Sequence, residues 1–129
     1  MTPRALIVLA AITGALAVSI GAFGAHGLDG YLEGRGLDAE LIAGRLAQFD
    51  TGARYHLVHA VALLALIPLV RTGGKPVAVA AWLFAAGTVF FSGSLYVLVL
   101  TNTPWLGAIT PIGGVLWIAA WLLLAFAKP

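Results

Sequence analysis

The chain contains no cysteine, and few of its 129 side chains are charged. The lack of cysteine excludes disulfides, thiolate metal sites and thiol catalysis. Charged residues make up only 9% of the chain, whereas hydrophobic residues make up 61%. A soluble domain of this size could not bury so much apolar surface, because small folded chains still expose a large share of their area. The composition therefore predicts an integral membrane protein, and no nucleic-acid partner is expected.

The apolar residues are gathered in four long runs. A helix needs about 20 predominantly apolar residues to cross the roughly 30 Å hydrocarbon layer. The runs cover about 5–25, 55–70, 77–100 and 105–127, and a tight turn at 101–104 makes the last two an antiparallel hairpin. We expect the first run to be retained rather than cleaved as a signal peptide, because it is long for one. The sequence thus predicts an all-α fold, with residues 1–129 forming a single compact bundle of four transmembrane helices.

The distribution of Lys and Arg predicts the orientation of this bundle. Four spans place both termini and the short loop at 71–75 on one side of the membrane. That side carries basic residues and no acidic residue, whereas the other side carries three arginines among five acidic residues. The positive-inside rule counts mainly the basic residues of short loops. We therefore expect a multi-pass protein of the cell inner membrane with both termini in the cytoplasm. The basic residues on the cytoplasmic side are Arg4, Arg71, Lys75 and Lys128.

The outer loop, residues 28–54, is the one sizeable polar segment. Within it, Asp38 can cap a short helix in which Ile42, Leu46 and Phe49 recur at helical spacing. This pattern is typical of an interfacial helix that lies flat on the bilayer surface. We interpret it as a cover for the outer rim of the bundle, with docking of a partner as the alternative.

Small residues form stripes along the first and third spans. Membrane helices associate through close packing, which small residues favour. We therefore expect a tightly packed bundle, in which Gly21→Leu would push helices apart. A stripe left uncovered by the bundle would be free to contact another subunit. The stripes are Ala10, Gly14, Ala17, Gly21 and Gly24 in the first span, Ala15, Ser19 and Ala22 on a second face of it, and Ala78, Ala81, Ala85, Thr88 and Ser92 in the third.

Polar side chains from all four spans are expected at one depth in the outer half of the membrane. His56 and His59 share a helix face at spacing i, i+3, and His26 ends the first span. Intramembrane polar residues usually face the bundle interior and often mark function. We expect the three histidines to approach one another, with Tyr96 and Thr110 nearby. The full candidate cluster is His26, His56, His59, Ser92, Tyr96 and Thr110.

Three roles remain open for this candidate cluster. A hydrogen-bonded structural network is the favoured interpretation. The alternatives are a Zn²⁺ or Cu²⁺ site formed by His26, His56 and His59, and a site for an organic ligand such as a quinone or a lipid headgroup. Four short helices offer little room for haem, and no cofactor or metal is assigned from the sequence.

Four segments together resemble a known family. They are Gly21-Ala22-Phe23-Gly24-Ala25-His26-Gly27-Leu28, then Phe49-x-Thr51-Gly52-x-x-Tyr55-His56-x-x-His59-Ala60, then Phe91-Ser92-Gly93-Ser94-Leu95-Tyr96, and finally Gly107-Ala108-Ile109-Thr110-Pro111-Ile112-Gly113-Gly114. In this order they resemble the domain-of-unknown-function family four hundred and twenty-three, the YgdD-like small inner-membrane proteins. The resemblance covers nearly the whole chain and implies a four-helix membrane protein without a known activity.

Several functions are therefore compared as hypotheses. The first is an interaction or accessory protein of a larger membrane complex, or a homo-oligomer, embedded in the lipid bilayer. The second is a binding module for a metal ion or a small ligand at the histidines. A small transporter acting as an oligomer is weaker, because no charged residue lies mid-membrane to relay ions. An enzyme is weakest, because no carboxylate lies within a span beside a histidine.

Overall fold

The computed structural model describes residues 1–128. Within them, four helices are long and apolar enough to cross a membrane, namely Pro3–His26, Ala39–Leu69, Gly74–Thr101 and Pro104–Leu124. This confirms the predicted all-α fold with four membrane-spanning helices. In chain order the elements are α1 (Pro3–His26), α2 (Leu28–Glu33), α3 (Ala39–Ala65), a 3₁₀ turn (Ile67–Leu69), α4 (Gly74–Thr88), a π-helical segment (Val89–Gly93), α5 (Ser94–Thr101), a second 3₁₀ turn (Pro104–Ala108) and α6 (Thr110–Leu124).

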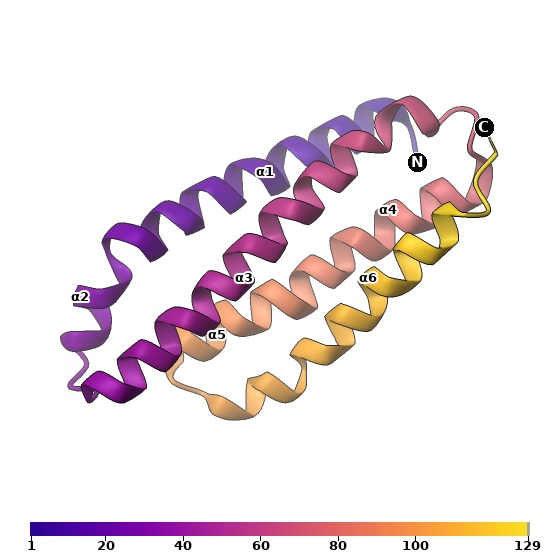
Figure 1. The fold of residues 1–129 in the computed structure, drawn as a ribbon. Helices are drawn as coiled ribbons and strands as arrows, with labels where there is room; N and C mark the ends of the chain where they lie inside the picture. The colour runs from indigo at the N-terminus through magenta and orange to yellow at the C-terminus, as the bar shows by residue number, and fades with distance from the viewer. Residues whose placement is uncertain (129) are drawn as a thin grey trace.

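The four long helices run side by side, and both termini lie at the same end of the bundle (Figure 1). Helix α1 packs mainly against α3, and α6 packs mainly against α4, while α3 also contacts α4 and α5. The two central helices bury 39% and 50% of their most apolar stretches, whereas α1 and α6 bury 22% and 17%. The bundle therefore has a centre made of α3 and α4–α5, with α1 and α6 as flanking helices.

The outer part of α3 differs from the predicted surface helix. Asp38 caps the helix as expected, since its carboxylate accepts a hydrogen bond from the Leu41 amide at 2.9 Å. The helix then continues unbroken to Ala65 instead of ending in the outer loop. The reason is that its buried side chains stay in phase, at Ile42, Phe49, His56 and Leu63, and seven residues are close to two helical turns.

The outer loop is consequently shorter than expected, and its short helix lies elsewhere. The segment Leu28–Glu33 forms α2, whose buried Leu28 and Leu32 pack in one cluster with Ile42 and Phe49. The face of α3 that was predicted to lie on the bilayer surface is thus covered by α2 and by the outer part of α5.

The small residues of α1 are used only in part. The buried face of this helix is formed by Leu6, Ala10, Thr13 and Ala17. A Cβ atom added at Gly14 or Gly21 would meet nothing within 4 Å, so the expectation that Gly21→Leu would push helices apart is wrong. Gly24 is the close contact instead, because a Cβ there would lie 2.8 Å from Cε1 of Phe49. The second stripe remains exposed, at Ala15, Ser19 and Ala22.

Two glycines allow α4 and α6 to approach each other at backbone contact. A Cβ atom at Gly113 would collide with the backbone nitrogen of Phe91 and lie 2.7 Å from the carbonyl oxygen of Gly87. A Cβ atom at Gly87 would collide with the Trp117 ring. The π-helical segment Val89–Gly93 follows at this point. Such segments are rare insertions within α-helices and occur frequently at functional sites.

Two arginines tie the outer loop and α3 to the end of α5. Arg35 donates from Nη1 to the carbonyl oxygen of Leu100 at 2.8 Å, and the Tyr31 hydroxyl donates to the same oxygen at 2.9 Å. Arg45, only 8% exposed, donates from Nε and Nη2 to Oδ1 of Asn102 at 3.0 and 2.6 Å. Asn102 has a left-handed backbone, with φ 50°. Cations at a helix C-terminus are favourable, because its last carbonyls lack partners within the helix.

Candidate functional site

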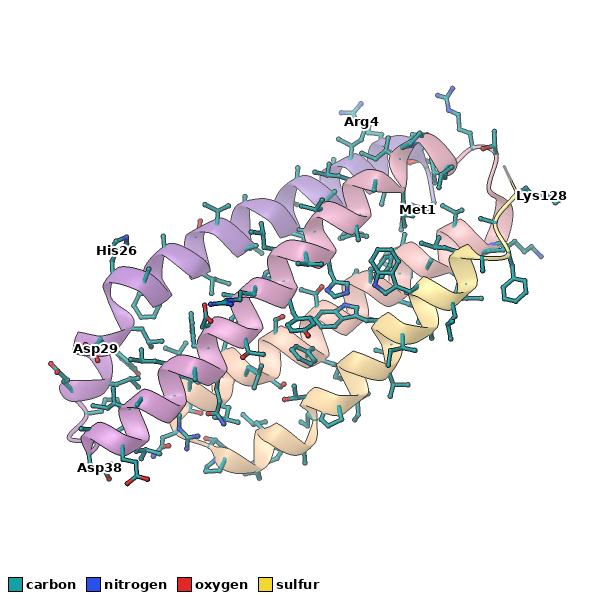
Figure 2. The ribbon with its side chains drawn as sticks, in the orientation of Figure 1. Met1, Arg4, His26, Asp29, Asp38 and Lys128 are labelled. Atoms are coloured by element: carbon teal, nitrogen blue, oxygen red, sulfur yellow. The ribbon has the colours of Figure 1, made fainter. Side chains whose placement is uncertain are left out.

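His26 does not join the other two histidines. It ends α1 at the end of the bundle opposite the termini, with its side chain exposed and directed away from the other helices (Figure 2). It lies two residues beyond Gly24, which packs on Phe49, and a rotation of about 200° along the helix turns it to the opposite face. Among residues 1–128, no group of three or more His, Cys, Asp or Glu side chains could hold a metal ion. The predicted convergence of three histidines is therefore wrong.

His56 lies in a hydrogen-bonded network at the centre of the bundle. Its Nδ1 is 3.1 Å from the Tyr96 hydroxyl. Ser92, which is fully buried, donates to the carbonyl oxygen of Gly52 in α3 at 2.8 Å. The structure thus brings His56, Ser92 and Tyr96 to the contact of α3 with the π-helical segment and α5, while Thr110 lies elsewhere. The Thr110 hydroxyl is 2.8 Å from that of Ser94 and links the start of α6 to α5.

His59 packs against α6 rather than against His56's partners. Its ring stacks on Trp117, with centroids 3.7 Å apart and planes 5° from parallel. Its Nδ1 is 2.8 Å from the Tyr55 carbonyl oxygen, which can only accept, so Nδ1 carries the hydrogen. The indole Nε1 of Trp117 donates to the carbonyl oxygen of Phe84 at 3.1 Å. Both rings are therefore held in place by backbone carbonyls as well as by each other.

A groove of about 450 Å³ lies between α3 and α6, beside this stacked pair. Its base includes His59 and Trp117, each only 4% exposed. Its rim includes Tyr55 and Trp121, which are 49% and 51% exposed. The groove opens at the surface that the bundle presents to the bilayer. Its lining residues are Tyr55, Val58, His59, Phe91, Gly114, Trp117, Ile118 and Trp121.

The second ring nitrogen of His59 is a hydrogen-bond acceptor that faces this groove. A neutral imidazole with its hydrogen on Nδ1 has a free lone pair on Nε2. Within the described part of the chain, Nε2 has no hydrogen-bond partner. Every fully buried polar side-chain atom in that part of the chain does have one. The Nε2 atom must therefore touch accessible space, and the groove is the space that His59 lines.

A second groove lies on the other side of α3, between α1 and α4–α5. Its volume is about 290 Å³, and its polar lining includes Thr13, His56, Thr88 and Tyr96. The two threonine hydroxyls are already used, since Thr13 donates to the Leu9 carbonyl at 2.7 Å and Thr88 to the Phe84 carbonyl at 2.9 Å. The His56 ring is paired with Tyr96. The polar groups of this groove thus serve the fold, in contrast to His59.

The sequence reasoning selected His59 but missed Trp117 and Trp121, which form a wall of the candidate site. A usable signal was present, because Gly113 precedes Trp117 by four residues and Gly114 precedes Trp121 by seven, both of which are helical spacings. Each spacing places a small residue and a large ring on the same helix face. Which ring would meet His59 depends on how α6 is rotated against α4, and the contact of Gly87 with Gly113 sets that rotation.

Comparison with known proteins confirms the resemblance seen in the sequence. Residues 20–114 match the family described as "Protein of unknown function (DUF423)". The UPF0382 membrane protein YwdK of Bacillus subtilis is 42% identical over 126 residues, which cover 96% of this chain and 95% of the relative. A UPF0382 membrane protein of Staphylococcus aureus, SAB0533, is 42% identical over 124 residues, covering 96% and 94% of the two chains. No solved structure matches. With its four apolar helices, the chain is thus an integral membrane protein that belongs to the DUF423 family.

Proposed function

We propose that this protein binds a small lipophilic molecule, drawn from the bilayer, in the groove between α3 and α6. The observation that carries the proposal is the free acceptor nitrogen of His59 at the base of an aromatic groove. Ligand sites are typically concave and apolar, with a few well-placed polar groups, and measure about 300–1,000 Å³. The groove fits this description in its lining and its volume.

The surrounding side chains hold the acceptor in a fixed direction. The bond from Nδ1 to the Tyr55 carbonyl sets the tautomer of His59, and the stacked Trp117 ring sets the plane of the imidazole. The Phe84 carbonyl in turn holds Trp117. A lipophilic ligand would enter laterally between the half-exposed rings of Tyr55 and Trp121. Of the alternatives in the sequence, a metal site formed by three histidines loses its support, because His26 lies apart.

A variant whose side chain fills the groove would test this proposal. Gly114 lines the groove, and a Cβ there would have its nearest neighbour, the Phe91 ring, at 3.9 Å. Gly114→Leu should therefore occupy the groove with little strain. Gly21→Leu is the matched control, because it adds the same side chain at another open position. Mass spectrometry of organic extracts should find a lipophilic molecule with the wild-type chain and the control, and its loss from Gly114→Leu. Wild-type protein purified from its native membrane with none would contradict the proposal.

An accessory role in a larger membrane complex is the second candidate function. It is favoured by one face of the flanking helix α1, where Ala15, Ser19 and Ala22 are all exposed. Small residues let the helix of another membrane protein approach closely. Because the chain lacks cysteine, Ala15→Cys provides a unique cross-linking point. Cross-linking in native membranes should give an adduct of defined mass from Ala15→Cys and none from Val115→Cys on α6. An adduct twice the mass of the chain would instead indicate a homo-oligomer.

We also propose the inner membrane as its location, with both termini in the cytoplasm. Arg4 and Lys128 lie together at one end of the bundle, whereas Asp29 and Asp38 lie at the other (Figure 2). Arg71 lies in the loop before α4 and Lys75 in the first turn of α4, at the same end of the bundle as the termini (Figure 1). The positive-inside rule favours the cytoplasm for that end.

A further inference from the structure

We infer that the groove between α3 and α6 selects a planar ring that donates a hydrogen bond, namely a phenol or hydroquinone headgroup on an apolar tail. This inference rests on the proposed function and names the class of ligand for the same site. Its basis is the juxtaposition of one fixed acceptor, an aromatic lining and an apolar opening to the bilayer.

The polarity of the site follows from the tautomer of His59. The Tyr55 carbonyl occupies Nδ1–H, so the neutral ring offers Nε2 to the groove as an acceptor. The ring could donate from both nitrogens only as a cation, and no acidic side chain lines the groove to stabilise that charge. A ligand that brings an O–H or N–H group satisfies Nε2. A quinone or another carbonyl ligand would place oxygen lone pairs against it.

The shape of the site favours an aromatic ring. Tyr55 lies nearly parallel to Trp117, with centroids 5.8 Å apart and planes 12° from parallel. Phe91 packs near both, at 5.2 Å from Tyr55 and 4.6 Å from Trp117. Aromatic rings gain from offset-stacked and edge-to-face contacts beyond their buried area. An aromatic ring in this groove would therefore be in contact with other aromatic rings.

The apolar opening of the groove is the reason for expecting an apolar tail on the ligand. Val58 and Ile118 both line the groove, and both are exposed at the apolar surface of the bundle. They continue the groove into the bilayer without a polar break. No lysine or arginine lines the groove, so the site does not fit a phosphate headgroup, which requires cationic or multiple N–H donors.

The test uses three probes that share one ring and one tail: a decyl-substituted benzohydroquinone, its benzoquinone and its dimethyl ether. Their affinities for the full chain in phosphatidylcholine nanodiscs are measured by calorimetry, with the hydroquinone kept under nitrogen. We expect the hydroquinone to bind at least about tenfold more tightly than the other two, the ratio that one hydrogen bond of about 1.4 kcal/mol gives. Quinone binding as tight as that of the hydroquinone would overturn the inference.

Two variants locate the acceptor. His59→Phe keeps an aromatic ring on Trp117 but removes Nε2, so it should bind all three probes within about twofold of the ether's wild-type affinity. Tyr55→Phe removes the phenol hydroxyl from the rim and should keep the tenfold preference. A preference that survives His59→Phe and disappears in Tyr55→Phe would overturn the inference. If His59→Phe does not fold, ¹⁵N NMR of the wild-type histidine rings decides, because only the hydroquinone should shift the His59 Nε2 resonance.

The probes also separate this inference from the proposed function. Equal binding of all three, abolished by Gly114→Leu, would overturn the inference and leave the groove as a site for another ligand. Binding of none, or binding unaffected by Gly114→Leu, would overturn both.

Discussion

Gly113 and Gly114 are neighbours in α6 with very different surroundings. Gly113→Ala should lower the stability of the bundle by about 1–3 kcal/mol, the usual cost of overpacking, because its Cβ meets backbone atoms of Phe91 and Gly87 that cannot rotate away. Gly114→Ala should be nearly neutral, because its nearest neighbour is a ring 3.9 Å away. Thermal unfolding in mild detergent measures both, and equal melting of the two variants would contradict the close contact of α4 with α6.

Ser92 provides a second test, of a bond between helices. Ser92→Ala should cost about 0.5–1.5 kcal/mol, because it removes the hydrogen bond to the Gly52 carbonyl and hydrogen bonds between membrane helices contribute modestly. Thr51→Ala is the control, because the Thr51 hydroxyl bonds to Ala47 within its own helix and is exposed. The comparison is again made by thermal unfolding. A larger loss in Thr51→Ala would show that Ser92 does not hold α3 to the third span.

At the scale of the element, the continuity of α3 makes a prediction with proline. Ala47→Pro should destabilise the protein by about 3 kcal/mol, because proline inside a helix removes one hydrogen bond and collides with the preceding turn. Ala39→Pro should be tolerated, because residue 39 is the first of the helix and Asp38 before it already has an extended backbone, at φ −72° and ψ 160°. Circular dichroism during thermal unfolding measures both. Unchanged stability of Ala47→Pro would contradict the continuous helix and support the separate surface helix expected from the sequence.

The turn between α5 and the last span depends on Asn102 in two ways. Asn102→Gly keeps access to the left-handed backbone but removes the acceptor of Arg45, whereas Asn102→Ala loses both. We expect Asn102→Ala to be less stable than Asn102→Gly by about 1–2 kcal/mol, the cost of the left-handed conformation for a residue with a Cβ. Both should be less stable than the wild type in denaturant unfolding. Equal stability of the two variants would show that the left-handed backbone carries no strain.

The elements that the sequence predicted well are those defined by length and hydropathy. The first, third and fourth spans needed only their apolar runs, and Asp38 was recognisable as a cap. The start of the second long helix was not predictable in this way, because Arg45, Asp50 and Arg54 interrupt its hydropathy. Arg54 pairs with Asp50 at 2.8 Å within the helix. Arg45 is satisfied by Asn102, 57 residues away in the sequence, which no local pattern reveals.

For the candidate site, the sequence predicted the depth of His56 and His59 in the membrane but not which neighbouring helix each side chain faces. Helical spacing placed His56 and His59 on one face, yet a shift of about 60° between them is enough for each to meet a different neighbour. His56 faces Tyr96, and His59 faces Trp117. The rotation of each helix about its own axis depends on contacts such as that of Gly87 with Gly113. The π-helical segment changes the rotation of the third span further, and the sequence of Val89–Gly93 does not indicate this segment.

For the whole molecule, the orientation in the membrane can be tested directly. Reporter fusions after Lys75 and after Lys128 should both indicate the cytoplasm, and a fusion at Gly36 should indicate the opposite side. The physical reason is the concentration of unopposed basic residues at the end that holds both termini. Phosphatase and fluorescent-protein fusions give complementary signals, so each position has its own control. The reverse pattern would invert the bundle and place the outer loop in the cytoplasm.

The arginine contacts at the outer end have a consequence for the order of folding. The Arg35 bond to Leu100 and the Arg45 bond to Asn102 join residues 65 and 57 positions apart in the chain. Synthesis proceeds from the N-terminus, so α1, α2 and α3 emerge well before their partners at the end of α5. Until then their hydrogen-bond partners are local ones, the Tyr31 hydroxyl for Arg35 and the Gln48 side-chain oxygen for Arg45. Closure of the outer end is therefore a late event, and it waits for the third span to cross the membrane and deliver the carbonyl of Leu100 and the amide of Asn102.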